Sequence, residues 1–399
     1  MNMNFWQDLP RPIIGLSPMD GVTDASFRSI VAQQGKPDVT FTEFTHVHDV
    51  CRGPEVFLEP LIYSDIERPM VAQLYGNDPS LFYQAAHAVC ELGFDGLDIN
   101  MGCPSKSVAA SGSGAGLIRT PELARAILQA AKRGIEDWAS GNTLEQAGFT
   151  PARVAAFQRL NQERGGDHRA IRRSLPLSVK TRIGYDSVTV EDWMEQLMRE
   201  HPAVISLHGR TLRQMYRGVA DWASIARAAA VVKGTGTGTG TGTETLLFGN
   251  GDIHSLSEAM ARVRETGVDG VLVGRAVLGA PWFFRSKEQA RELARGINGS
   301  EVELRPEDVP LDQRFTVLLD HARQFQALCG QKRFYRMRKH LGWYCKGFSH
   351  AAALRSRMVQ VSSFSELEAV LDDFRALRVT DSVVAEPNDD LDMPVSRCG

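Results

Sequence analysis

A lone thiol follows an apolar run in the stretch GLDINMGCPSKSV, residues 96–108. Cys103 stands between Gly102 and Pro104, in a loop where no small apolar filler is needed. A nucleophilic cysteine needs a neighbouring histidine or carboxylate that promotes thiolate formation, and the adjacent residues offer neither. A general acid needs the opposite, because a thiol with an ordinary pKa of about 8.5 stays mostly protonated at neutral pH. We therefore expect Cys103 to donate a proton.

Polar residues, or residues with special backbone properties, also stand at the ends of most other apolar runs. In chain order they are Pro18, Met19 and Asp20, Gln73, Asn100, Lys180 and Arg182, His208, Asn250, Gly251 and Asp252, and Gly274 and Arg275. A single polar strand end usually has a capping or salt-bridging role. Many of them at one end of a sheet are typical of an active site.

The last two of these strand ends indicate a phosphate site. Gly251 and Gly274 would let the backbone approach a ligand closely, and helices expected after them would aim N–H groups at it. Arg275 adds a fixed positive charge. Turn glycines with a surface arginine are the alternative interpretation. The glycines of 111–116 do not directly follow a strand, so we expect a mobile loop there that covers the site.

Eight apolar runs that alternate with helix-like stretches must position these residues. The expected strands are 12–16, 39–44, 70–75, 94–100, 176–183, 203–208, 245–250 and 268–274. Near-continuous apolar strands between helices predict a parallel sheet covered on its faces. Eight such units within roughly 300 residues favour an α/β fold of the (β/α)8 TIM-barrel class, whose reactive groups gather at the C-terminal strand ends. A doubly wound open sheet is the alternative.

The domain boundaries follow from where this alternation stops. A barrel domain is predicted over 1–305, with a polar, Arg-rich insertion at 138–174 and a flexible Gly-Thr loop at 234–243. A C-terminal helical domain is predicted over 306–380. Residues 381–399 are acidic, and we expect a disordered tail.

The helical domain carries an unbalanced positive segment. Helices are expected over 311–329 and 331–376, and residues 321–365 contain nine lysines and arginines without one aspartate or glutamate. Aromatic residues are interleaved with them. Such a segment is typical of a surface that contacts nucleic-acid phosphates, and a solvated helix face over core aromatics is the alternative.

Bulk composition narrows the function classes. The longest apolar runs are too short for a membrane span, and the N-terminal stretch MNMNFWQDLPRPIIGLSP lacks the pattern of a secretory signal. The six cysteines show neither CxxC spacing nor zinc-type pairing with histidine. We therefore expect free thiols, no metal site and a cytoplasmic location.

Taken together, these motifs resemble the bacterial, FMN-dependent tRNA-dihydrouridine synthase family. The blocks SPMDGVTD, DINMGCPSK, VKTRIG, HGRT, GNGDI and GRA are similar to that family's motifs in the same order, and RMRKHLGWY is similar to its RNA-binding domain. The resemblance covers 12–285 apart from the two interruptions, and continues more weakly over 311–376. The barrel motifs and RMRKHLGWY point to different bacterial subgroups, so the target uridine stays open.

The resemblance implies a fold, a reaction and two cofactors. FMN would lie across the open end of the barrel, NADPH would reduce it, and the C5–C6 double bond of a tRNA uridine would be reduced to dihydrouridine. Cys103 would protonate C5 while a hydride reaches C6.

The resemblance also implies roles for the remaining residues. FMN contacts would come from Pro18, Met19, Asp20, Gln73, Lys180, His208, Asn250, Gly251, Asp252, Gly274 and Arg275. Asn100 and Arg182 would bind the uracil edge, and Arg336, Arg338 and Lys339 would contact the tRNA. No membrane or protein partner is expected.

Two rival interpretations are open. An FMN barrel that reduces a free pyrimidine or enone would have no use for the basic helical domain. A tRNA-binding or folding factor that has lost catalysis would not be expected to keep Cys103, Asn100 and Lys180.

Overall fold

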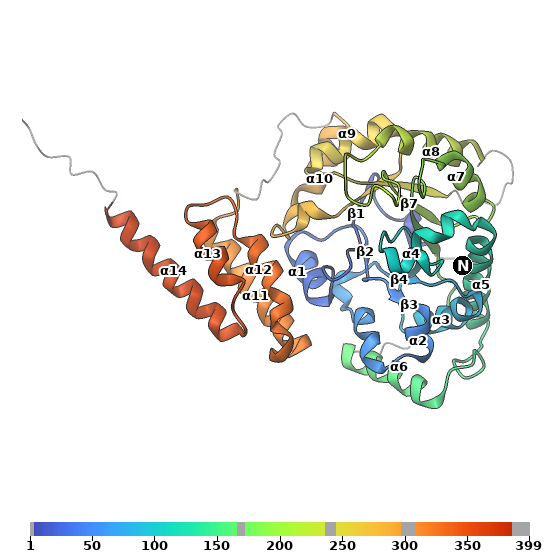
Figure 1. Cartoon of the computed structure of the whole chain (residues 1–399), viewed down its shortest axis with the longest axis horizontal. Helices are drawn as coiled ribbons and strands as arrows, with labels where there is room; N and C mark the ends of the chain where they lie inside the picture. Colours follow the sequence, from blue (N-terminus) through green and yellow to red (C-terminus); the bar gives the residue numbers. More distant parts are fainter. Residues whose placement is uncertain (1–3, 166–171, 236–244, 297–307, 385–399) are drawn as a thin grey trace, which may run out of the picture. The chain divides into compact units, whose positions relative to one another are not determined.

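The chain divides into two compact units, Met1–Asp308 and Val309–Gly399. The structure, a computed structural model, describes residues 4–165, 172–235, 245–296 and 308–384 (Figure 1). The predicted boundary at 305/306, nearly all of the Gly-Thr loop, part of the insertion and most of the acidic tail therefore lie outside the described residues. No described helix combines the length and apolarity that crossing a membrane would require.

Parallel strands form the first unit's sheet. They are β1 (Ile13–Leu16), β2 (Thr40–Phe41), β3 (Thr45–His46), β4 (Met70–Tyr75), β5 (Gly96–Met101), β6 (Leu177–Arg182), β7 (Val204–His208), β8 (Leu246–Asn250) and β9 (Gly270–Val273). Their order is β1-β9-β8-β7-β6-β5-β4-β2, with β3 also on β4. Between β1 and the start of β2, the Leu16 N–H donates to the Val39 carbonyl at 3.0 Å and the Asp38 N–H to the Ile14 carbonyl at 2.9 Å. These bonds close the sheet. The predicted barrel is therefore confirmed, and the alternative prediction of a doubly wound open sheet was wrong.

One expected strand is interrupted. The prediction of a continuous strand over 39–44 was wrong, because β2 ends at Phe41 and β3 begins at Thr45. Between them, the Thr42 side-chain oxygen accepts a hydrogen bond from the Gln73 N–H at 2.9 Å. A side chain thus takes the place of a backbone acceptor in the hydrogen-bond ladder with β4. Since β2 and β3 both pair with β4, together they occupy one of the eight strand positions of the barrel.

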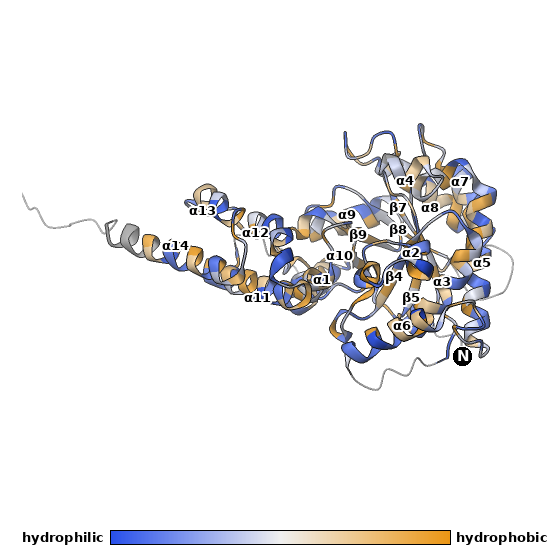
Figure 2. Ribbon diagram, turned by 60° about the horizontal axis from the view of Figure 1, so that its bottom comes forward, coloured by the Kyte–Doolittle hydropathy of each residue, from blue (hydrophilic) through white to orange (hydrophobic). Residues whose placement is uncertain are grey.

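Helices surround the barrel (Figure 1). The longer ones are α1 (Ala25–Gly35), α3 (Pro79–Glu91), α5 (Pro121–Ala139), α7 (Val190–Met198), α8 (Trp222–Thr235), α9 (Leu256–Thr266) and α10 (Lys287–Ala294), and the short ones are α2 (Val47–Arg52) and α4 (Lys106–Ala110). Short 3-10 helices are η1 (Phe5–Gln7), η2 (Glu55–Leu61), η3 (Asp65–Glu67), η4 (Gly114–Arg119), η5 (Arg275–Val277) and η6 (Phe283–Ser286). The helices mix hydrophilic and hydrophobic residues (Figure 2), as expected where one face is buried.

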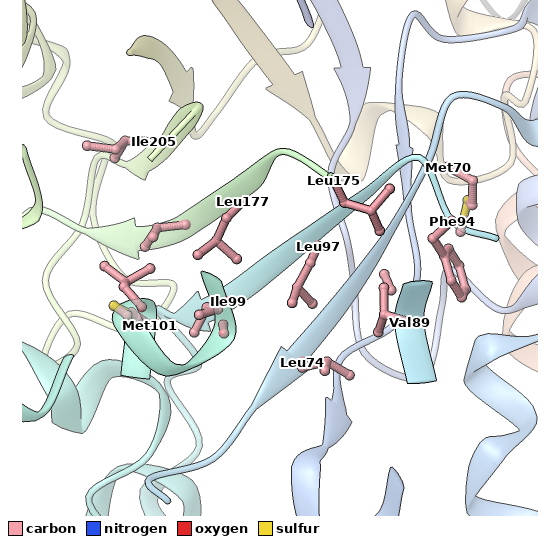
Figure 3. Close-up of a cluster of buried hydrophobic side chains, with 14 of the residues drawn as sticks. Met70, Leu74, Val89, Phe94, Leu97, Ile99, Met101, Leu175, Leu177 and Ile205 are labelled. Atoms are coloured by element: carbon pink, nitrogen blue, oxygen red, sulfur yellow. The ribbon is translucent and has the colours of Figure 1, made fainter. Parts of the chain in front are cut away.

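Strand alternation separates two apolar clusters. Leu97, Ile99 and Met101 of β5 belong to the cluster between strands and helices (Figure 3). The second cluster draws on residues of opposite alternation and fills the barrel interior: Trp6, Ile13, Val39, Phe41, Val71, Val204, Leu246, Phe248 and Leu272. The polar side chains of the predicted site lie beyond this plug, at the C-terminal strand ends.

Helix α10 holds the closure between β1 and β2. The Asp38 carboxylate accepts from the Ile14 N–H at 2.7 Å and from Lys287 Nζ at 2.8 Å, and it pairs with the buried guanidinium of Arg291. Arg291 Nε also donates to the Pro12 carbonyl at 3.1 Å. The last helix of the barrel is thereby tied to both sides of the closure.

The described part of the insertion contains α6 (Pro151–Arg164). Its arginines bind backbone carbonyls of neighbouring elements, since Arg153 donates to Asp49 at 2.9 Å and Arg164 to Leu92 at 2.7 Å. Phe157 is fully buried in the outer cluster. The helix is therefore an integral part of the barrel's outer layer.

The second unit is helical. It contains α11 (Leu311–Cys329), η8 (Gln331–Met337), α12 (Arg338–Tyr344), α13 (Ala351–Met358) and α14 (Phe364–Val384). The prediction of α11 is confirmed, but a continuous helix over 331–376 was wrong. Gly347 and His350 have φ of 73° and 64°, which ends the helical path between α12 and α13. Phe315, Phe348 and Phe374 pack edge to face in its core.

Candidate active site

A cavity of about 590 Å³ lies at the C-terminal ends of the barrel strands. Most of the barrel residues predicted from the sequence line it: Pro18, Met19, Asp20, Asn100, Cys103, Lys180, Arg182, His208, Asn250, Gly251, Asp252, Gly274 and Arg275. Strand register explains the convergence, because Asn100 pairs with Lys180 and His208 lies between Arg182 and Asn250. Residues from several strands therefore face one space.

The loop that carries Cys103 is pinned on both sides. Asn100 Oδ1 accepts from the N–H groups of Gly102 at 3.0 Å and Cys103 at 2.8 Å. From β6, Arg182 Nε donates to the Gly102 carbonyl at 2.7 Å. The thiol is thus presented to the cavity by a fixed backbone.

Residues 111–116 do not form the predicted covering loop. Gly114 begins η4 and is buried with the next three residues, and a side chain on it would start 3.1 Å from Cys103 Cβ. Its φ of 55° also favours glycine. The prediction was wrong because these glycines serve close packing against the Cys103 loop.

The electrostatic surroundings keep Cys103 in its thiol form. Burial is the main cause that raises the pKa of Cys103, and Asp20 adds to the effect. A backbone hydrogen bond at Ser105 and the cations Arg182 and Lys180 oppose it. The thiol is only 6% exposed, so it is a protonated group beside the cavity at neutral pH.

Lys180 and His208 stand beside each other on adjacent strands. Burial, reinforced by Arg182, lowers the pKa of Lys180 to about 8. Lys180 Nζ donates to Asn250 Oδ1 at 3.3 Å. Burial and the surrounding cations lower the pKa of His208 to about 2, so its ring is neutral at physiological pH. Together they offer a cation and a neutral imidazole to a ligand.

Arg182 links the Cys103 loop to the 209–219 loop. Its Nη1 donates to the carbonyls of Thr211 and Met215, both at 3.1 Å. Met215 has a φ of 54°, and both Met215 and Tyr216 line the cavity. Neither had been assigned to the site. The signal that could have found Tyr216 is an aromatic residue in the loop directly after the HGRT strand end.

The 249–252 and 274–275 turns meet on the opposite side of the cavity. Asp252, with a φ of 49°, accepts from Arg210 and from Arg275 at 2.6 Å each. Only the three-residue η5 follows β9, and α9 begins six residues after Asn250, so helix ends are not the donors that were expected. A carboxylate repels a phosphate, and we therefore interpret Asp252 as the residue that positions Arg275.

Gln73 is the one barrel candidate that does not line the cavity. It is fully buried behind Asn100, whose Nδ2 donates to Gln73 Oε1 at 2.9 Å. Gln73 Nε2 donates to Asp98 Oδ2 at 2.7 Å. Burial raises the pKa of Asp98 to about 6, so its carboxylate is ionised at neutral pH. Asp98 was missed because it lies one layer below the strand end.

The basic candidates Arg336, Arg338 and Lys339 lie in the second unit, on η8 and α12. Arg338 donates to the carbonyls of Gln360 and Val361 at 2.9 Å each, which fixes the turn before α14. Lys339 is exposed. Arg338 therefore stabilises the fold of the second unit, whereas Lys339 is an exposed residue of α12.

One group of side chains comes close enough to share a metal ion among the described residues: His46, His48 and Asp49. His46 Nδ1 already accepts from the His48 N–H at 3.3 Å, as the cap of α2. The His48 side chain is 54% exposed. Metal-binding histidines usually have a supporting partner, so we assign no metal site here. The five described cysteines, 51, 90, 103, 329 and 345, are free thiols.

Comparison with known proteins gives a consistent match. Residues 15–140 and 168–379 match the family "Dihydrouridine synthase (Dus)". "Probable tRNA-dihydrouridine synthase 2" of Bacillus subtilis (strain 168) is 32% identical over 377 residues, covering 94% of this chain and 97% of that protein. "Probable tRNA-dihydrouridine synthase" of Staphylococcus aureus (strain COL) is 31% identical over 379 residues, covering 94% and 97%.

Two solved structures show distant similarity to this chain. DHODH from Eimeria tenella in complex with ferulenol is 14% identical, with a TM-score of 0.45 over 71% of this chain and 82% of that chain. Morphinone reductase in complex with tetrahydroNAD is 12% identical, with a TM-score of 0.36 over 73% and 89%. Likeness at this level carries no argument about function.

Proposed function

The chain belongs to the dihydrouridine synthase family, and from this we propose that it is a flavin-dependent enzyme that reduces a uridine of tRNA to dihydrouridine. The resemblance of its sequence motifs to this family is thereby confirmed. The observation that carries the proposed chemistry is the cavity, where the buried thiol of Cys103 faces the same space as Lys180, Arg182 and His208.

The residues around the cavity fit an FMN molecule. His208 Nδ1 is buried and has no hydrogen-bond partner among the described residues, as expected of a group awaiting a ligand. Lys180 and Arg275 would balance the charges of flavin and phosphate, and Gly251 and Gly274 leave the backbone accessible. Pro18 and Met19 would contact the ring. When bound and reduced by NADPH, FMN would supply the hydride for C6 of the uracil.

The chain's own groups would orient the uracil and protonate it. Cys103 would give its proton to C5, and the raised pKa keeps that proton available at neutral pH. The described hydrogen bonds of Arg182 use Nε and Nη1, so Nη2 is the part that can face a uracil carbonyl. Asn100 would add its remaining Nδ2 hydrogen. Both faces of the base must be reached, which requires the uridine to leave its stack in the tRNA.

Replacing Gly251 with alanine should weaken FMN binding by about 10–100-fold, since backbone strain at such a position costs about 1–3 kcal/mol. Gly251 has a φ of 129°, and an added Cβ would lie 2.7 Å from the Ala220 Cβ. Flavin fluorescence titration measures the change.

A matched control separates backbone strain from the contact. Gly141 has a φ of 117° and nothing within 4 Å of an added Cβ, so Gly141→Ala should leave FMN affinity unchanged. Adding Ala220→Gly to Gly251→Ala should recover part of the loss. Wild-type affinity in Gly251→Ala would show that this turn does not hold the cofactor.

We propose that the second unit binds tRNA through cations of η8 and α12, with Arg336 half-buried and Lys339 exposed. Changing Arg336 and Lys339 together to glutamine should weaken tRNA binding and reduce the slope of log affinity against log salt by roughly 0.7–0.9 for each phosphate that the protein no longer neutralises. Arg338 is left intact because it fixes the turn before α14. Fluorescence anisotropy at several salt concentrations provides the slope.

The control removes one lysine and one arginine from the first unit. Lys233 and Arg264 are exposed residues of α8 and α9, and their double change to glutamine should leave the salt slope as in the wild type. Equal slopes in both double variants would contradict the assignment of the second unit.

Nucleoside mass spectrometry on unmodified tRNA, incubated with the purified protein, FMN and NADPH, tests the proposed function directly. Dihydrouridine mapped to one position is the expected product. Bound flavin with NADPH oxidation but no modified tRNA would instead indicate a reductase of a small molecule. A protein that binds tRNA but no flavin would be a non-catalytic RNA-binding factor.

A further inference from the structure

A chain of buried polar side chains runs beneath the Cys103 loop. Ser178 Oγ donates to Asp98 Oδ1 at 2.5 Å, and Asp98 Oδ2 accepts from Gln73 Nε2 at 2.7 Å. Gln73 Oε1 accepts from Asn100 Nδ2 at 2.9 Å, and Asn100 Oδ1 accepts from the Cys103 N–H at 2.8 Å. Asp98 and Gln73 are fully buried, and Ser178 and Asn100 are at most 7% exposed. Below this layer the barrel is filled by apolar residues.

The direction of these hydrogen bonds is fixed from both ends, by the acceptor Asp98 below and by the two donating N–H groups of the loop above. An ionised carboxylate only accepts, so Gln73 must turn its NH2 group towards Asp98. Its carbonyl oxygen then faces Asn100, which must present its own NH2 group in turn. Asn100 Oδ1 is thereby left towards the loop, where backbone N–H groups need an acceptor. If the Asn100 amide were reversed, its NH2 group would face the N–H groups of Gly102 and Cys103, and three buried donors would lack an acceptor, which is costly.

We propose that Asp98 is a positioning residue for proton transfer: through Gln73, it anchors the Asn100 side chain that holds the loop of Cys103. The inference rests on the proposed function, because the thiol it places is the proposed donor. Asp98 itself does not line the cavity. Its expected effect is on the placement of the thiol and not on contacts with FMN or tRNA.

Asp98→Asn tests the proposal. The new amide removes the negative charge that accepts from Gln73 and so weakens this hydrogen bond, which leaves Asn100 oriented mainly by the two loop N–H groups. Since a displacement of about 1 Å can cost 10²-fold in rate, we expect dihydrouridine formation to slow by about 10–100-fold. The dissociation constants of FMN and tRNA should stay near the wild-type values. A variant with wild-type rates would overturn the proposal.

A polarity swap distinguishes anchoring by a carboxylate from simple packing. When Asp98→Asn is combined with Gln73→Glu, the carboxylate introduced at position 73 accepts both from the amide introduced at position 98 and from Asn100 Nδ2. Asn100 is then anchored by a carboxylate again, so the double variant should recover most of the rate that Asp98→Asn alone loses. Gln73→Glu alone places two carboxylates together and should be slower than the double variant. If the rate loss of the double variant equals the two single losses combined, the proposal would be overturned.

A second readout does not depend on turnover. The rate at which iodoacetamide alkylates Cys103, followed by mass spectrometry of its peptide, reports the placement of the thiol. It should rise severalfold in Asp98→Asn and return towards the wild-type value in the swap, with thermal unfolding confirming that each variant folds. An unchanged alkylation rate would refute the inference. A wild-type protein that forms no dihydrouridine would instead refute the proposed function, while the alkylation rates still decide the role of Asp98.

Discussion

Cys103→Ala should slow the reduction of uridine by about 10²–10⁴-fold, the usual contribution of a general acid. The thiol lies beside the cavity, and its raised pKa preserves the proton that C5 requires. FMN and tRNA affinities should change little, because the loop is held through backbone groups that alanine keeps. The measurement is the single-turnover oxidation of reduced flavin by tRNA, with dihydrouridine counted by mass spectrometry.

The pH profile of the same reaction provides a further check. A general acid acts while it is protonated, so a raised pKa extends activity to a higher pH than an ordinary thiol would allow, and the rate then falls. Cys103→Ala should lack the part of the alkaline fall that belongs to the thiol, whereas a fall near pH 8 from the loss of the Lys180 charge should remain in both proteins. Cys51 is also buried but lies outside the cavity lining, so Cys51→Ala should react at the wild-type rate. Equal rates in Cys103→Ala and the wild type would remove Cys103 as the acid.

Glu67→Ala should lower the free energy of unfolding by about 3–5 kcal/mol, the usual cost of removing one partner from a buried ion pair. Arg28 of α1 and Glu67 of η3 are almost fully buried, with Nε and Oε2 2.7 Å apart. Glu67 Oε1 also accepts from the Ser64 N–H at 2.8 Å. The variant leaves the Arg28 charge buried without its carboxylate.

Urea unfolding followed by tryptophan fluorescence measures this change. Five of the six tryptophans lie within residues 1–308, so the signal reports mainly the barrel. Glu191→Ala is the control, because its partner Arg227 and Glu191 itself are about half exposed, and we expect at most roughly 0.5 kcal/mol there. Arg28→Met combined with Glu67→Leu should be less destabilised than Glu67→Ala. A small loss in Glu67→Ala would show that Arg28 is satisfied by backbone carbonyls alone.

The fold could be predicted because its strands are continuous apolar runs bounded by polar ends. The errors arose where a side chain or an unusual φ overrode the pattern. Thr42 replaces a backbone acceptor between β2 and β3, and composition does not distinguish it from any other strand threonine. His350 adopts a left-handed conformation, which is uncommon for any residue other than glycine, so its identity alone did not indicate a break in the helix.

The candidate site was predicted as a set of strand ends, and the register brings most of them to one cavity. The hydrogen-bond partners of these residues, and therefore their separate roles, could not be predicted in the same way. Asn100 stands at a strand end but its oxygen already holds the Cys103 loop, and Asp252 is occupied by two arginines. Asp98 could have been found from alternation alone, because it lies two residues before Asn100 on the same side of β5.

The ion pair between α10 and the barrel closure has a consequence for the order of events during synthesis. Asp38 and Arg291 are 253 positions apart in the chain. Strand β1 and the residues just before β2 leave the ribosome early, whereas the guanidinium that joins their ends emerges only after all nine strands. The nascent barrel therefore lacks this ion pair until α10 is translated. Until then, the closure between its first two strand positions is not stabilised by the last helix of the unit.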